Sequence, residues 1–288
     1  MERRIIINAD DFGLHPAVNQ GIIDGFYNGC ITSTSIMPGG AAFDEAVKLA
    51  SVHPKLGIGV HLMLVGGRAV SKPAEIPTLA DAQGNLSLDY PVFLKRYFTG
   101  KINKQEIRRE LTAQVGKVAK TGLVITHLDS HQHMHVVPGI IDIVLDIAAQ
   151  FAIPSIRIPA EPLLFHGGYP LKCSRLIART GLSVLSEIAA WKVRQRGLRA
   201  PKHFFGMLAG GNLQLEYLLT IIRQLPSGVS EIMMHPGVND VILQKSYQWG
   251  YHWQDELQAV TSVRARNCLQ EEKVKLISFR ELCDESIN

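Results

Sequence analysis

The sequence predicts a single α/β domain over residues 1–288, built as a (β/α) barrel of the TIM-barrel type, closed or distorted. Its 46% hydrophobic and 19% charged composition is typical of a globular protein with a sizeable core, and no linker divides it. Apolar strand-like runs alternate with helix-like segments, which favours a parallel sheet. Polar side chains follow several of these strands, and parallel barrels build their active sites at that end.

The first three predicted strands lead into small or polar residues. Residues 3–8 contain a continuous apolar run typical of a buried parallel strand, and Ala9-Asp10-Asp11-Phe12-Gly13 follows it. The next segment predicts a helix over 16–27, with Pro16 near its start and Gly29 after its end. A strand over 31–37, a helix over 43–52 and a strand over 56–64 carrying His61 come next.

The middle of the chain contains a long excursion. Residues 66–101 lack clear periodicity, and excursions of this length are usually functional, so we expect an active-site loop or lid. Asn103 is expected to cap a helix reaching Thr121, with Glu106 as its capping-box acid. A strand over 123–128, a helix over 138–151 and a short strand over 155–158 carrying Arg157 follow.

The last third begins with a basic helical insertion over 160–202. The segment from Lys172 to Lys202 contains eight basic residues and one acid, Glu187, so its net charge is +7. The remainder of the chain has a net charge of −3, which gives the total of +4. A solvated helix face is one interpretation, and contact with anionic lipid or another acidic partner is the other. A helix over 213–225, a strand over 230–234 leading to His235, a Trp-rich loop, a helix and a strand over 274–278 complete the chain.

Several classes of protein are not expected. No run approaches the roughly 18 apolar residues of a membrane span, and the start resembles no signal peptide. The four cysteines form no CxxC pair, which is typical of reduced thiols in a cytoplasmic protein. We therefore expect a cytoplasmic location, with peripheral contact on the inner face of the membrane through 172–202 as a further expectation. No nucleic-acid-binding module is recognisable, and the Asp-Phe-Gly at 11–13 lacks the other kinase motifs.

A histidine-rich stretch follows the strand over 123–128. Histidine or aspartate occupies alternate positions, namely His127, Asp129, His131, His133 and His135. On an extended strand these side chains share one face but lie about 7 Å apart, so only one or two of them can bind the same metal ion. The other ligands must come from other strands. We expect His131 on the metal and the remaining four as supporting or substrate-facing groups.

Asp11, His61 and His131 together supply one carboxylate and two imidazoles, a three-ligand set with open positions for a catalytic divalent metal. This ligand set favours zinc, with magnesium, manganese, cobalt and nickel as alternatives. Asp10 would take a proton from a metal-activated water and His235 would protonate a leaving amine.

Arg157 would orient Asp10, and Asp129 and His133 would support the site. This constellation predicts hydrolysis of an amide or ester. Each residue also has a structural interpretation, because strand-end aspartates cap helices and strand histidines are often core residues.

Four motifs, in the same order over nearly the whole chain, resemble the YdjC/ChbG family of carbohydrate deacetylases. They are Asn8 to Gly13, Gly59-Val60-His61, Thr126 to His133, and Met234-His235-Pro236-Gly237. The resemblance implies a TIM-barrel-like fold and metal-dependent removal of an N-acetyl group from an amino sugar. It implies Asp11, His61 and His131 as ligands, Asp10 as base and His235 as acid.

The insertion, together with Arg157-Ile158-Pro159-Ala160-Glu161-Pro162, is similar to the hopanoid-associated branch often called HpnK. That branch implies an N-acetylglucosaminyl group on a bacteriohopane polyol as substrate. Soluble chitooligosaccharides are the alternative within the class. A metal phosphoesterase and a non-catalytic metal-binding protein are the alternatives outside it, and homo-oligomerisation stays open.

Overall fold

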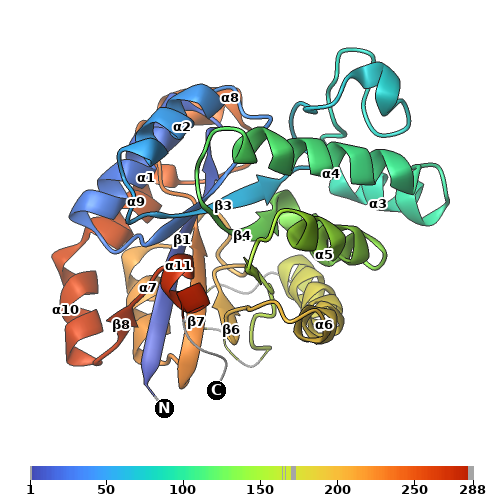
Figure 1. Cartoon of the computed structure of the whole chain (residues 1–288). Helices are drawn as coiled ribbons and strands as arrows, with labels where there is room; N and C mark the ends of the chain where they lie inside the picture. The colour runs from blue at the N-terminus through green and yellow to red at the C-terminus, as the bar shows by residue number, and fades with distance from the viewer. Residues whose placement is uncertain (1, 164, 166, 170–172, 285–288) are drawn as a thin grey trace.

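Helices surround a curled parallel sheet in the computed structural model, which describes residues 2–163, 165, 167–169 and 173–284 (Figure 1). The strands are β1 (Arg3–Phe12), β2 (Ser33–Ile36), β3 (Gly57–Leu62), β4 (Ile125–Ser130), β5 (Ser155–Ile156), β6 (His203–Phe205), β7 (Gly228–Met234) and β8 (Lys275–Leu276). They pair in the order β5-β4-β3-β2-β1-β7-β6, with β8 also paired to β1, and every pairing is parallel.

The helices of the described chain lie mostly between successive strands, as the alternating pattern predicts. They are α1 (Pro16–Asn28), α2 (Phe43–Ser51), η1 (Pro73–Glu75), α3 (Tyr90–Phe98), α4 (Lys104–Ala119), η2 (His131–Val136), α5 (Ile140–Gln150), α6 (Cys173–Gln195), α7 (Leu215–Arg223), α8 (Asp240–Ser246), α9 (Trp253–Thr261), α10 (Val263–Glu271) and α11 (Phe279–Asp284). Within the described residues, no helix is long and apolar enough to cross a bilayer.

The two ends of the sheet meet through backbone contacts. The amide of Ile156 donates to the carbonyl of Arg199 at 2.9 Å, and the amide of Arg199 donates to the carbonyl of Pro154 at 3.0 Å. The strands at this seam, β5 and β6, are only two and three residues long, so no continuous ladder joins them. The predicted barrel is therefore confirmed in its distorted form.

β1 lies at the centre of the sheet. It pairs with β2, β7 and β8, and Ile5, Ile6 and Ile7 are completely buried, as expected for a parallel strand covered on both faces. The strand is longer than the sequence predicts, because pairing continues to Phe12 after a register shift. Asp10 and Asp11 are therefore part of the strand instead of following it.

Several short elements were not predicted, namely η1, α3, η2, β6, α8 and α11, and α9 and α10 take the place of a single predicted helix. α3 lies inside the 66–101 excursion, where only Phe93 and Tyr97 are buried, so its apolar pattern is too short to stand out. β6 lies directly after the basic insertion and pairs with β7 over three residues.

The helix cap at Asn103 is confirmed, because its side chain accepts a hydrogen bond from Gln105 N. The predicted capping box is wrong. Glu106 instead accepts hydrogen bonds from the amide and hydroxyl of Thr78, at 2.7 and 2.8 Å.

The 66–101 excursion is attached to α4. Glu110 accepts hydrogen bonds from the amides of Val70 and Ser71, each at 2.8 Å, beside the contact between Glu106 and Thr78. Its first residue, Gly66, has φ +72°, and a Cβ added there would lie 3.0 Å from the His131 ring. The excursion thus begins against a predicted site residue, and its role as a lid stays a prediction.

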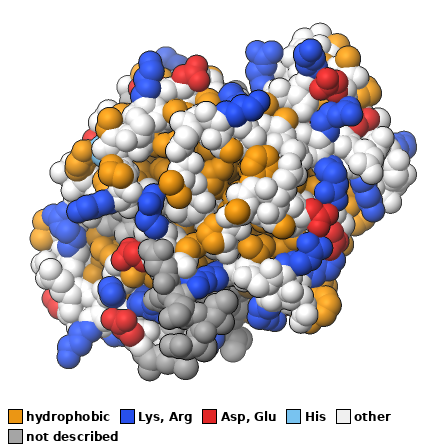
Figure 2. Space-filling view, viewed as in Figure 1, with side chains coloured by type: hydrophobic (Ala, Val, Ile, Leu, Met, Phe, Trp, Pro, Cys, Tyr) orange, Lys and Arg blue, Asp and Glu red, His pale blue; other side chains and the backbone are white. Residues whose placement is uncertain are grey.

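Much of the basic charge of the insertion is compensated locally. Lys192 pairs with Asp142 at 2.6 Å, and Arg196 pairs with Asp146 at 3.0 Å. Arg179 is buried and donates to backbone carbonyls. Figure 2 shows basic and acidic side chains close together on the side of α4, α5 and α6. Lys172, the first basic residue of the segment, lies outside the described residues.

Candidate active site

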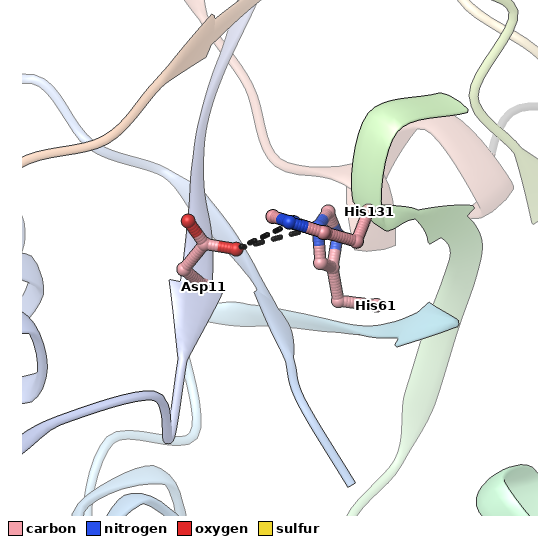
Figure 3. Close-up of side chains that lie close together, drawn as sticks. All are labelled: Asp11, His61 and His131. Atoms are coloured by element: carbon pink, nitrogen blue, oxygen red, sulfur yellow. Dashed lines mark ion pairs between the residues drawn. The ribbon is translucent and has the colours of Figure 1, made fainter. Parts of the chain in front are cut away.

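Asp11, His61 and His131 converge at the carboxyl ends of β1, β3 and β4 (Figure 3). One oxygen of Asp11, Oδ1, lies 3.4 Å from His61 Nε2 and 3.4 Å from His131 Nδ1. All three residues are buried. Asp11 has φ +69°, and the register shift between Ala9 and Phe12 surrounds it. Irregularities of this kind re-aim a strand side chain, which is how Asp11 reaches the cluster.

Strand pairing orients His61. It lies directly opposite Asp129 in the β3–β4 ladder, and Asp129 Oδ1 is 2.9 Å from His61 Nδ1. Ser35 Oγ lies 3.2 Å from the same nitrogen. These contacts leave Nε2 facing Asp11. A histidine held by a carboxylate through one ring nitrogen is the arrangement typical of metal-binding imidazoles.

The histidine-rich stretch does not continue as a strand, so the expectation of five side chains on one face is wrong. β4 ends at Ser130, and η2 begins at His131 with left-handed backbone at Gln132 and His133. Ser130 Oγ accepts a hydrogen bond from the amide of His135 at 2.9 Å, which closes the turn. The chain bends here because a serine hydroxyl satisfies the backbone that a longer strand would have paired.

The other three histidines of the stretch are packed in the interior. His127 stacks on Phe279 with ring centroids 3.7 Å apart, and His135 Nε2 lies 3.0 Å from the carbonyl oxygen of Arg157. His133 packs edge-on against Phe204. Burial lowers the pKa of His127 to about 3 and that of His135 to about 4, so both rings are neutral.

Arg157 joins three carboxylates beside this cluster. Its guanidinium contacts both oxygens of Asp10 at 2.6 and 2.7 Å, Asp129 Oδ2 at 2.8 Å and Glu231 Oε1 at 2.7 Å. Arg157 and all three partners are almost completely buried. The predicted contact between Arg157 and Asp10 is therefore present, and it is bidentate, which fixes the orientation of the Asp10 carboxylate.

His235 follows β7 at the same rim. Glu256 on α9 accepts a hydrogen bond from the backbone amide of His235, and its Oε2 lies 3.8 Å from His235 Nδ1. The ring of Tyr251 packs against the imidazole at 4.9 Å between centroids. The Trp249 ring lies 5.2 Å from that of His131, so aromatic residues of the loop after β7 border both histidines.

The electrostatic environment suits a cation. Burial alone would raise the pKa of Asp11, but the His131 and His61 imidazoles lower it to about 2. Burial alone would lower the pKa of His61, but Asp129 and the neighbouring carboxylates raise it to about 9. The site therefore has a strong preference for positive charge between these three residues.

The donor set fits a metal ion. Both Asp11 oxygens are buried and lack hydrogen-bond partners among the described residues, although buried carboxylates are normally satisfied. The three ligand atoms lie within 4.8 Å of one another. Asp10, His61 and Asp129 form a second such group, but Arg157 already supplies its positive charge. The Asp11 group is the better candidate.

Two residues at this site were not predicted. Glu231 lies within the apolar run of β7, and an acid inside a buried strand is a signal that could have identified it. Glu256 lies near the start of α9, where acids are common, so the sequence carries no comparable signal.

Comparison with known proteins identifies the family of this chain. The family model described as YdjC-like protein matches residues 4–271. A carbohydrate deacetylase from Brevibacillus brevis is 31% identical, over 97% of this chain and 99% of that protein. A chitooligosaccharide deacetylase from Yersinia enterocolitica is 30% identical, over 98% of this chain and 100% of that protein.

Among solved structures, one described as a candidate cellobiose-phosphate cleavage protein from Enterococcus faecalis is 26% identical. It superposes with a TM-score of 0.77 over 98% of this chain and 100% of that one. The likeness thus extends over the whole barrel and includes all the strands that carry the site. The chain belongs to the family of YdjC-like proteins.

Proposed function

We propose that this protein is a metal-dependent carbohydrate N-deacetylase, which hydrolyses the acetamide group of an amino sugar. The observation that carries the proposal is the buried Asp11 carboxylate, which lies between two imidazoles and lacks a hydrogen-bond partner among the described residues. Its relatives named carbohydrate deacetylases support the choice of reaction.

Asp11, His61 and His131 would hold one divalent cation. When bound, such a cation acts as a Lewis acid that polarises the acetamide carbonyl and lowers the pKa of a nearby water. Zinc is favoured by the two imidazoles, because magnesium prefers oxygen ligands. The contact between His61 Nδ1 and Asp129 fixes which ring nitrogen is free to bind.

Asp10 is proposed as the general base. Asp10 Oδ1 accepts hydrogen bonds from Arg157 and from Asn8 Nδ2 at 2.8 Å, whereas Oδ2 contacts Arg157 and keeps a lone pair that could accept a proton from the attacking water. Arg157 fixes the direction of the carboxylate, and Glu231 and Asp129 hold Arg157 itself. The base is therefore preorganised before substrate binds.

His235 is proposed as the general acid. The oxygen of water bonds to the acetamide carbon, the C–N bond breaks, and the sugar nitrogen receives a proton from His235 as acetate leaves. Glu256 Oε2 lies 3.8 Å from Nδ1 and would help to hold the imidazole in position. The products are a free amino sugar and acetate.

The alternatives outside this class have less support. A phosphoesterase needs a cation that can receive phosphate, and Arg157, the candidate predicted from the sequence, is fully buried among three carboxylates. A purely structural metal site is usually closed by four protein ligands, whereas the group at Asp11 offers three.

For the substrate we propose an N-acetylglucosaminyl group on a bacteriohopane polyol, reached by a cytoplasmic enzyme at the inner face of the membrane. In support, Val184, Ile188 and Trp191 lie on one face of α6, each more than half exposed. These three apolar side chains support membrane contact more strongly than the basic charge of the helix does, because Lys192 and Arg196 are already paired with Asp142 and Asp146.

Soluble chitooligosaccharides are the second candidate, favoured by the relative from Yersinia enterocolitica that is named for them. The deciding experiment measures acetate release from diacetylchitobiose and from N-acetylglucosaminyl hopanoid. We expect both activities to stop with a chelator and to return with zinc, and turnover to be faster on the hopanoid. Full activity in metal-free protein would refute the metal site, and faster turnover of diacetylchitobiose would refute the lipid substrate.

A further inference from the structure

A separate pocket lies near the candidate active site. Its volume is about 380 Å³, and its walls include two tyrosines, two amides, a carboxylate and an imidazole. These side chains are Tyr169, Tyr217, Asn212, Gln214, Glu216 and His252. None of them belongs to the catalytic groups proposed above.

The pocket lies at the same rim of the barrel as the catalytic groups. Its walls come from the segments that follow β5, β6 and β7, including the first turns of α7. In parallel barrels the segments after the strands build the substrate site. The pocket is therefore placed where further parts of a substrate would extend.

Tyr251 connects the candidate acid with residues beside the pocket. One side of its ring packs on His235 at 4.9 Å between centroids. It also lies so close to Gly211 that a Cβ at that position would overlap the ring. Gly211 accepts a hydrogen bond from the amide of His252 at 2.8 Å, and His252 lines the pocket. Residues next to the pocket wall therefore contact the ring that packs on the candidate acid.

The chemistry of the walls fits a hydroxylated, uncharged group. Tyr169 and Tyr217 are 5.2 Å apart at an interplanar angle of 52°, which offers apolar faces for C–H groups. The hydroxyl of Tyr217 is buried away from the cavity, so the ring of Tyr217 forms this part of the wall. The carboxylate of Glu216 is paired with Arg264 at 2.6 Å, so the pocket has no strong preference for a charged ligand.

We propose that this pocket binds the polyhydroxylated group that is glycosidically attached to the acetylated sugar, either a second sugar ring or an open-chain polyol. The inference rests on the proposed deacetylase function and adds a subsite to it. It assigns recognition of the substrate beyond the acetylated ring to Tyr217 and its neighbours.

The test fills the pocket. Thr220 lines it from α7, and its hydroxyl donates to the carbonyl of Glu216. Thr220→Trp places an indole in the cavity, and Tyr217→Phe removes only the buried hydroxyl. Thr261→Trp is the matched control, because Thr261 makes the same hydrogen bond within α9, to Leu257, and does not line this pocket.

Activity is measured on N-acetylglucosamine, on diacetylchitobiose and on the erythritol glycoside of N-acetylglucosamine. We expect Thr220→Trp to raise KM about tenfold for one or both of the larger substrates, the size of one lost subsite contact, with kcat unchanged. Tyr217→Phe should leave KM unchanged, because the buried hydroxyl does not reach the cavity. The monosaccharide and the Thr261→Trp variant should show no change.

The pattern identifies the ligand. An effect confined to diacetylchitobiose assigns the pocket to a sugar ring, and one confined to the glycoside assigns it to a polyol. Unchanged KM for both, or an equal change for the monosaccharide, would overturn the proposal. If the wild type releases no acetate, the proposed function fails, and calorimetric titration of both larger compounds still tests the pocket. About tenfold weaker binding of either one to Thr220→Trp supports the pocket, and equal affinity for both contradicts it.

Discussion

Arg157→Met tests the carboxylate network that holds the proposed base. The substitution keeps an apolar side chain but removes five contacts of 2.6–2.8 Å to Asp10, Asp129 and Glu231. All three carboxylates are almost completely buried, so each would lose its contact with the guanidinium in a poorly solvated environment, although Asp129 would keep His61 and Asp10 would keep Asn8. Loss of one partner from a buried ion network costs about 3–5 kcal/mol. We expect a decrease of this size in the free energy of unfolding at pH 7.5, measured by urea denaturation with chelator present.

The loss should depend on pH. Burial raises the pKa of Glu231 to about 7 even though Arg157 lowers it, so loss of the guanidinium should raise it further above its unfolded value. Groups of this kind stabilise the fold below the unfolded pKa, and the stability is lost as pH rises through the folded pKa. The variant should therefore be closer to wild type at pH 5 than at pH 7.5. Adding Glu231→Gln should recover at least about 1 kcal/mol at the higher pH, because one buried charge is removed.

Arg108→Met is the matched control. Arg108 forms a 2.8 Å ion pair with Asp146, but its side chain is 42% exposed, so the pair should contribute at most about 1 kcal/mol. The reasoning is refuted if Arg157→Met destabilises no more than Arg108→Met, or if its effect is the same at both pH values.

Three further predictions concern other residues. Asp11→Asn should lower kcat/KM at least about a thousandfold and abolish zinc binding in equilibrium dialysis, whereas the surface variant Asp24→Asn should bind zinc normally. Burial raises the pKa of Glu161 to about 7 from 4.5, despite the backbone amides of Gly206 and Leu208 that favour its charged form. The wild type should thus lose up to about 3 kcal/mol of stability between pH 4.5 and 8 through this group, and Glu161→Gln should flatten the profile of urea midpoints. Gly59→Ala should destabilise by about 1–3 kcal/mol, because a Cβ there meets the His127 ring; an unchanged melting temperature would contradict this packing.

The histidine-rich stretch shows how much of the site the local sequence pattern can predict. Alternation predicted a shared face for five side chains, and strand spacing limited how many could bind one ion. The strand ends at Ser130, because the Ser130 hydroxyl accepts a hydrogen bond from the amide of His135 and a turn begins there. The outcome for His131 agrees with the prediction, since it is the member of the stretch that lies against Asp11. Its role as a ligand stays a prediction.

The sequence by itself determined the fold class and the strand ends that carry Asp11, His61, His131 and His235. It could do so because apolar periodicity is local, and parallel strands bring their carboxyl ends to one rim.

Only the tertiary structure decided what surrounds those residues. Glu231 is 74 positions from Arg157, and Glu256 is 21 positions from His235. Contacts between residues so far apart depend on the curl of the sheet and the packing of its helices. A buried carboxylate that orients a distant catalytic group is therefore hard to recognise from the sequence pattern of its own segment.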